Sequence, residues 1–301
     1  MTDTRHLPPE AAHSPTHLTV RRLMIDLAPG FDRHWNGGDA FMTAYCNALS
    51  MSFPLGEQFF IDSVKSGLKH LPDTPENQGL RDAAKGFIGQ EATHRHLHGL
   101  YNAHLTRQGL KNHWEVRAKI RQDRARQMLF EKSPRGYLHE LAVTAAFEHL
   151  TSIFGDLTLE RVGQDGDWFQ HAQEPMRTLW RWHAAEEAEH KCVSFDLYQR
   201  LGGNHRWRMR WFRFVLLQFS TDVIRQTVNN LWHDGTLFKF STWRSGLKFA
   251  FGRHGLLWRV LRPIRAYARQ DFHPLQVGHP TRASDWLQAH AGEWKPVNSA
   301  A

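Results

Sequence analysis

Four stretches of this sequence carry apolar residues at helical spacing, and each of these apolar stripes also carries a carboxylate. The four acidic residues are Glu57, Glu91, Glu148 and Glu187. Because an apolar stripe with a period of 3.6 residues faces the core of a helical protein, the sequence predicts four buried glutamates. Burying a carboxylate without compensation costs several kcal/mol. A chain with this pattern therefore needs positive charge inside its core.

Two of the stripes also carry a histidine three residues after the glutamate, as Glu91-x-x-His94 and Glu187-x-x-His190. Residues three apart on a helix point the same way, so each pair can bind one metal ion. Two such helices, together with one glutamate from each of two others, match the ligand set of di-iron and di-manganese carboxylate bundles. A single glutamate lies on the helix before each pair, Glu57 before the first and Glu148 before the second. This indicates that the same two-helix unit occurs twice in the bundle. We therefore predict a core that holds two divalent metal ions.

Every long segment between helix breakers has helical periodicity, and clear strand signals are absent. We predict an all-α fold, a ferritin-like helical bundle with a dinuclear metal core and an appended C-terminal helical region. The predicted parts are an N-terminal arm (1–36), a metal-binding helical bundle (37–202), a basic Trp-rich helical extension packed on the bundle (203–272) and a C-terminal tail (273–301).

The expected helices follow from the breakers and capping residues. They span roughly residues 39–71, 75–109, 114–132, 133–163, 167–202, 206–232 and 241–269. Pro54 lies inside the first of these patterns and predicts a kink or an interruption there.

Residues 203–269 contain thirteen Lys or Arg against only Asp222 and Asp234, a local net charge of +11. The same stretch holds Trp207, Trp211, Trp232, Trp243 and Trp258. Basic residues mixed with tryptophan suit an anionic membrane surface, a nucleic acid or an acidic partner. They also suit a solvated face on an appended helical region. We expect no nucleic acid, and two interpretations stay open: a solvated face, and peripheral membrane contact that admits a lipid-like substrate.

The two cysteines, Cys46 and Cys192, lie far apart and form no CxxC motif, so the sequence supports neither a disulfide framework nor a cysteine-based zinc site. The N-terminus has no apolar signal region. The longest apolar candidate for a membrane span, 211–224, is broken by Arg213 and Asp222. We expect a cytoplasmic protein, with peripheral membrane association left open.

Six motifs of this sequence resemble those of a family of bacterial proteins called predicted metal-dependent hydrolases. The motifs are FPLGEQFF, FIGQEATHRHLH, AAFEHLT, WRWHAAEEAEHKCVSFDLY, LWHDGTLF and YARQDFHPLQ. The resemblance covers roughly residues 18–290. It implies metal binding by the matching positions Glu57, Glu91, His94, Glu148, Glu187 and His190. The family name by itself defines no reaction.

His183 lies one turn before Glu187 on the same helix face. The resulting pattern His-x-x-x-Glu-x-x-His is similar to that of di-iron arylamine N-oxygenases, in which the extra histidine is a metal ligand. His183 is therefore either a seventh ligand or a histidine that supports the others. His98, one turn beyond His94, is a candidate for the same supporting role.

Several other polar residues near these motifs admit a site role or an ordinary structural one. Glu186 could take the place of Glu187, Asp196 could orient a ligating histidine, and His149 and Cys192 are expected to pack in the core. Asp271 and His273 are read as ordinary turn residues, with a site role as the alternative.

Carboxylate and imidazole ligands without a thiolate favour iron, and manganese or zinc also fit. Three functions stay open. The first is a hydrolase in which metal-activated water attacks a carbonyl or phosphoryl centre. The second is a di-iron oxygenase or oxidase that uses O2 to hydroxylate or N-oxygenate a small or lipid-like substrate. The third is a non-catalytic metal-binding protein. The sequence predicts no particular substrate, electron donor or oligomeric state.

Overall fold

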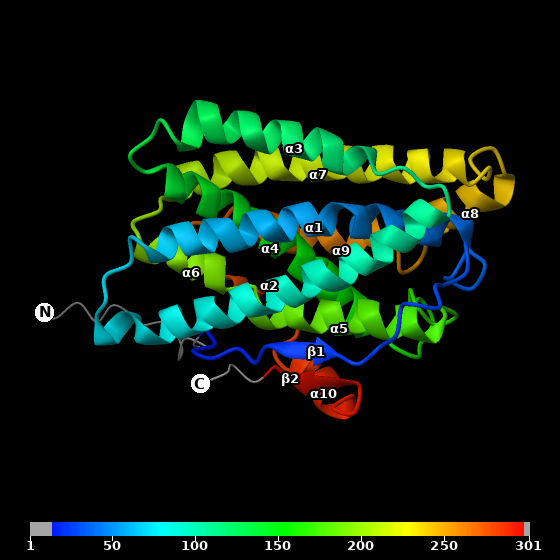
Figure 1. Ribbon diagram of the computed structural model, residues 1–301, viewed down its shortest axis with the longest axis horizontal. Coiled ribbons are helices and arrows are strands. Elements are labelled where there is room, and N and C mark those ends of the chain that lie inside the picture. The colour runs from blue at the N-terminus through cyan, green and yellow to red at the C-terminus, as the bar shows by residue number, and fades with distance from the viewer. Residues whose placement is uncertain (1–13, 298–301) are drawn as a thin grey trace, which may run out of the picture.

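Four long helices form the centre of the structure and carry the four glutamates predicted to be buried (Figure 1). The computed structural model describes residues 14–297. The central helices are α1 (Ala40–Leu68), α2 (Pro75–Arg107), α4 (Gly136–Glu160) and α5 (Glu174–His190). Helix α1 packs along α2 and α4, and α4 packs along α5. The predicted all-α helical bundle is confirmed.

Shorter helices and one long helix surround this centre. They are α3 (His113–Ala125), the π-helical turn η1 (Arg126–Phe130), α6 (Val193–Arg200), α7 (His205–His233), α8 (Phe240–Phe251), α9 (Leu256–Ala266), the 3-10 turn η2 (Pro274–Gln276) and α10 (Arg282–Ala289). Helix α7 packs on α1 and α4, with α3 beside it (Figure 1). Helix α8 contacts α1, and α9 contacts α4. Among residues 14–297, no helix is both long enough and apolar enough to cross a membrane.

The sequence predicts a kink or an interruption at Pro54, and of these the interruption does not occur, because helix α1 continues through this proline. Proline lacks the N–H that would bond the carbonyl four residues earlier, which here belongs to Ser50. The side chain of Asn102 on α2 supplies the missing donor, because its Nδ2 lies 2.9 Å from the Ser50 carbonyl oxygen. At its start, α1 is capped by Asp39, whose carboxylate accepts a bond from the Met42 amide at 3.0 Å. The helix thus continues without a break through the region that presents Glu57.

Two predicted helices are each broken in two. The segment expected as one helix over 167–202 forms α5 and α6, which are separated by a turn at Lys191 and Cys192. The segment expected over 241–269 forms α8 and α9, because the chain turns at Gly252 and Gly255.

The predicted arm and tail also contain regular structure that the sequence did not indicate. Strand β1 (Arg21–Leu23) pairs antiparallel with β2 (Trp294–Pro296), and Arg21 lies opposite Pro296. Helix α10 lies inside the predicted tail. Residues 1–13 of the arm and 298–301 of the tail lie outside the described residues, and the division into domains stays a prediction.

Candidate metal centre

All seven side chains predicted as metal ligands converge between α1, α2, α4 and α5. None of them is more than 4% exposed. The set comprises Glu57, Glu91, His94, Glu148, His183, Glu187 and His190. The helical period therefore places these residues on faces that meet, as the sequence predicted.

The converging atoms form two groups. Glu57, His94 and His183 each offer one ligand atom within 4.8 Å of the others, and so do Glu91, Glu187 and His190. In α2 the two residues of the Glu-x-x-His motif thus fall in different groups, whereas in α5 they share one. A three-residue step also advances about 4.5 Å along the helix axis, which lets one motif reach two neighbouring positions.

Glu187 stands between the two groups. Its Oε1 lies 2.8 Å from His183 Nε2 and 3.7 Å from His94 Nδ1, both in the first group. Its Oε2 lies 3.6 Å from His190 Nε2 in the second group. Glu148 joins the second group, because its Oε2 is 3.3 Å from the same His190 nitrogen. The geometry is that of two adjacent sites that share one carboxylate.

Apart from His183 Nε2 and Glu187 Oε1, which bond each other, the atoms that face the centre have no hydrogen-bond partners among the described residues. This holds for both oxygens of Glu57, Glu91 and Glu148, for Oε2 of Glu187, and for Nδ1 of His94 and Nε2 of His190. Buried polar atoms in folded proteins are almost always bonded, so a cluster of this kind needs another partner. Carboxylate oxygens and imidazole nitrogens are ligands for divalent metals such as iron, manganese and zinc. The donor set therefore fits two metal ions.

The electrostatics of the cluster lead to the same conclusion. Burial, followed by repulsion from neighbouring carboxylates, raises the pKa of Glu57, Glu91 and Glu148 well above the ordinary value. For Glu187 burial also acts to raise the pKa, but attraction to His190 and a hydrogen bond with His183 hold it well below the ordinary value. The protein alone can thus ionise one of the four carboxyl groups easily, and cations are needed to hold all four as carboxylates.

A family model described as predicted metal-dependent hydrolase matches residues 19–278. The chain belongs to this family. Searches of curated proteins and of solved structures find no match. Membership of the metal-dependent hydrolase family, together with the two buried groups of Glu and His, supports a metal-binding enzyme.

In this family member, a second layer of hydrogen bonds fixes two of the imidazoles. His94 Nε2 lies 2.9 Å from Glu186 Oε2, and Arg21 donates to Glu186 Oε1 at 3.0 Å. His190 Nδ1 lies 3.0 Å from Gln90 Oε1. Each ring therefore bonds outward through one nitrogen and turns the other toward the centre, as metal-binding histidines do.

This arrangement settles the position of Glu186, which the sequence left as an alternative to Glu187. Glu186 lies behind His94 and pairs with Arg21, so it faces away from the shared centre. Arg21 comes from β1, and sequence reasoning missed it. Nothing in the irregular arm around it indicated that it would reach the core.

His98 lies behind His183 in a similar way. His98 Nε2 is 2.7 Å from His183 Nδ1, and His98 Nδ1 is 2.8 Å from Ser50 Oγ. His183 Nε2 faces Glu187 and lies 3.9 Å from Glu57 Oε1. His183 Nε2 thus lies among the atoms that converge on the centre, and His98 lies behind the His183 ring.

The remaining candidates lie away from the centre. His149 Nε2 bonds the Pro263 carbonyl at 3.0 Å, and Cys192 is buried in the core. Asp196, considered for orienting a ligand, instead pairs with His273 at 2.9 Å. Asp271 forms an exposed ion pair with Arg269.

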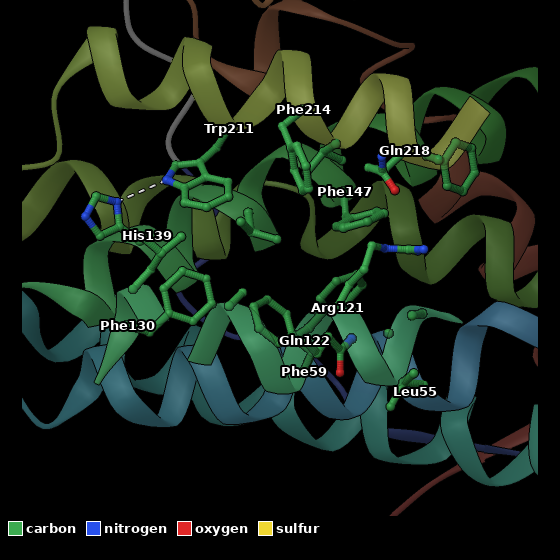
Figure 2. A pocket seen from close by; sticks show the side chains of 18 of the residues that line it. Leu55, Phe59, Arg121, Gln122, Phe130, His139, Phe147, Trp211, Phe214 and Gln218 are labelled. Carbon is green, nitrogen blue, oxygen red and sulfur yellow. Dashed lines mark hydrogen bonds between the residues drawn. The ribbon is translucent and has the colours of Figure 1, made fainter. Parts of the chain in front are cut away.

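A cavity of about 760 Å³ lies between α1, α3, η1, α4 and α7, and Glu57 forms part of its wall. Figure 2 shows side chains from these elements converging on it, including Phe59 of α1, Phe147 of α4 and Phe214 of α7. Most of the lining residues are apolar, and phenylalanine and tryptophan are the commonest types among them. Of the charged residues in the wall, Arg121 and Asp222 form an ion pair with each other. The helical periodicity of the sequence gave no sign of this cavity.

A second cavity, of about 50 Å³, touches His183 and Glu187. Phe53, Thr151 and Phe219 line both cavities. The ring of Phe53 also packs against the rings of His98 and His183, at centroid distances of 4.7 and 4.8 Å. These three side chains therefore separate the large cavity from the small space beside the metal centre.

Proposed function

We propose that this protein is a dinuclear metal enzyme that acts on an elongated, largely apolar substrate. One observation carries the proposal: the wall of the large apolar cavity includes Glu57, whose unpaired oxygens belong to the first ligand group. Ligand sites are usually apolar concavities with a few converging polar groups, and this cavity has that character. Its size also disfavours a non-catalytic metal-binding role.

The residues that would hold the metals follow from the two groups. Glu57, His94 and His183 would bind one ion, Glu91, Glu148 and His190 the other, and Glu187 both. Iron is the favoured metal, and manganese or zinc also fit. When bound, the ions supply Lewis acidity for hydrolysis or, as Fe(II), electrons for the reduction of O2.

The chain's own residues position the ligands and exclude water. Gln90 and Glu186 orient His190 and His94 through the hydrogen bonds described above. Phe53 and Phe219 lie between the large cavity and the small space beside His183 and Glu187. A substrate chain in this cavity would displace water from its wall and bring one of its carbons or a head group toward Glu57.

Two reaction classes fit this site, and one observation favours each. The family description favours hydrolysis. The lining favours oxidation of a hydrocarbon chain or of an amine, because an apolar wall binds hydrocarbon and offers little to a polar leaving group. The ferritin-like ligand pattern of four carboxylates with imidazoles is also one that supports di-iron chemistry.

Metal analysis and a cavity-blocking variant test the proposal. Gly56 lines the cavity next to Glu57, and a Cβ built there has only the Phe60 ring near it, at 3.9 Å. Gly56→Leu should place a side chain in the part of the cavity next to Glu57, retain about two metal ions per chain and weaken binding of a fluorescent fatty-acid probe. Gly99→Leu is the matched control, because Gly99 lies on α2 with nothing within 4 Å of an added Cβ. Equal probe binding by both variants would refute the proposed substrate site.

The reaction class is tested separately on the same protein. An oxidative enzyme loaded with Fe(II) consumes O2, and its consumption rises when an apolar substrate is added. A hydrolase turns over fatty-acyl esters without oxygen and also works with zinc or manganese. Loss of either activity in Glu91→Ala, with the helical circular dichroism retained, ties it to the metal centre.

A further inference from the structure

Exposed aromatic side chains concentrate in one part of the surface, from the end of α7 to the start of α9. We call this region the aromatic patch. It consists of Trp232, Phe238, Phe240, Trp243, Phe251 and Trp258. Phe238 and Phe240 are 85% and 83% exposed, an unusual state for phenylalanine. Contiguous exposed apolar surface of this kind marks an interaction site.

Contacts join four members of the patch in pairs and tie a fifth to the segment before α8. The rings of Trp232 and Phe238 lie 6.1 Å apart, and those of Phe251 and Trp258 lie 6.2 Å apart. The Trp243 indole donates to the Leu237 carbonyl at 2.7 Å, which joins α8 to the segment before it. The patch therefore spans α7, α8 and α9 and the turns between them.

Helix α8 is amphipathic, and it is the opposite face that holds it to the bundle. Gly246 lies against the ring of Phe41, and Phe249 packs on Phe41 and Tyr45, at ring distances of 6.1 and 4.9 Å. The other face carries Phe240, Trp243, Leu247 and Phe251 at helical spacing, all exposed. The aromatic face is thus presented outward by a helix that is already fixed to α1.

Positive charge surrounds the patch. The chain has no acidic residue from 235 to 270. Six exposed cations of this stretch have no acidic partner among residues 14–297: Lys239, Arg244, Lys248, Arg253, Arg262 and Arg265. Asp234, at one border, is already paired with Arg33 and His34.

This charge pattern distinguishes between two possible binding partners of the patch, a second copy of the chain and an anionic surface. A second copy of the chain would bring the same six cations against one another, which opposes self-association. A surface that carries negative charge and accepts aromatic rings at its boundary satisfies both features. We propose that the aromatic patch docks on the surface of an anionic lipid bilayer, with the rings at the headgroup boundary and the Lys and Arg side chains on lipid phosphates.

The proposal does not depend on which reaction the metal centre performs. Docking would place the enzyme at the lipid bilayer, into which an elongated apolar substrate partitions. Docking needs neither metal nor substrate, so its test is independent of the test of the proposed function.

Vesicle flotation of the purified full chain tests the proposal. The wild type should float with phosphatidylglycerol vesicles at low salt, float much less with phosphatidylcholine vesicles, and be partly released as salt is raised. Phe238→Ser combined with Phe240→Ser should weaken partitioning at least about tenfold. Both side chains are almost fully exposed, so the fold should be unaffected. Val116→Ser with Ile120→Ser, which removes two exposed apolar side chains of α3, is the control.

A charge-reversal pair tests the cationic part. Lys239→Glu with Lys248→Glu should reduce partitioning by about tenfold or more, because each Lys near an anionic surface contributes a factor of about five. Lys65→Glu with Lys69→Glu makes the same change in net charge at the C-terminal end of α1 and should have a much smaller effect. The proposal is overturned if the wild type does not float with anionic vesicles, or if the control pairs lose as much binding as the patch variants. It is also overturned if the Phe238 and Phe240 changes instead abolish a concentration-dependent dimer, since the occupant is then a second copy.

Discussion

Replacing Glu148 with glutamine should stabilise the metal-free protein and weaken the metal-loaded one. Glu148 is fully buried on α4, and neither of its oxygens has a hydrogen-bond partner in the described part of the chain. Burial and the nearby Glu187 raise its pKa well above the ordinary value of 4.5. Without metal, the folded protein must therefore carry this side chain as the neutral acid, whereas the unfolded chain ionises it.

The size of the effect follows from this difference. Protonating a carboxyl group of pKa 4.5 at pH 7 costs about 3 kcal/mol, since each pH unit is worth about 1.4 kcal/mol. Glutamine has no such cost. A chain of 301 residues has an unfolding entropy of about 0.6 kcal/mol per kelvin. Glu148→Gln should therefore raise the Tm of the metal-free protein by about 5 °C at pH 7.

The sign of the pH dependence is fixed by the raised pKa. The wild type without metal binds this proton in the folded state, so the Glu148 contribution to stability falls as pH rises above 4.5. The advantage of the variant should accordingly shrink to less than about 1 kcal/mol at pH 5. With metal bound, the Glu148 carboxylate becomes a ligand, and the wild type should then have a higher Tm than Glu148→Gln.

Thermal unfolding with and without chelator measures these differences. Glu140→Gln is the control, because Glu140 lies two turns earlier on α4 and outside the cluster. Its effect should be the same in the presence and absence of metal. If Glu148→Gln shifts the Tm in the same direction in both states, the cluster does not bind metal through Glu148.

Two further predictions concern residues that support the site. Asn102→Ala leaves the Ser50 carbonyl without its donor and should cost about 1–3 kcal/mol in the free energy of unfolding, measured by urea titration; an unchanged midpoint would contradict the role given to Asn102. Arg21→Met removes the partner of Glu186 and should weaken metal affinity at least about tenfold in a chelator competition, whereas Arg22→Met, on the exposed side of the same strand, should leave it unchanged.

The convergence of the ligand residues was predictable because helical periodicity alone fixes which side of a helix a residue occupies. Glu57 and Glu148 could be placed on core-facing stripes without knowing how the helices pack. His183 was found in the same way, one turn from Glu187. The division into two groups was not predictable, because it depends on the relative heights of α2 and α5 along the bundle.

Features that join distant parts of the chain were missed. Arg21 and Glu186 are 165 residues apart, and three-residue strands such as β1 carry no period that a sequence pattern could reveal. The break between α5 and α6 falls at Lys191 and Cys192, which are neither glycine nor proline. The large cavity depends on how far α3 and α7 stand from α1 and α4, which is a property of packing.

The small sheet has a consequence for the two ends of the chain. The Arg21 guanidinium lies over the ring of Trp294 in β2, 4.9 Å from its centre, while it bonds Glu186 behind His94. Trp294, near the C-terminus, thus helps to position Arg21, near the N-terminus. Arg21 in turn holds Glu186 against His94 in the core of the bundle. Truncating the chain or adding a tag close to this sheet should therefore disturb the position of His94, and with it metal binding.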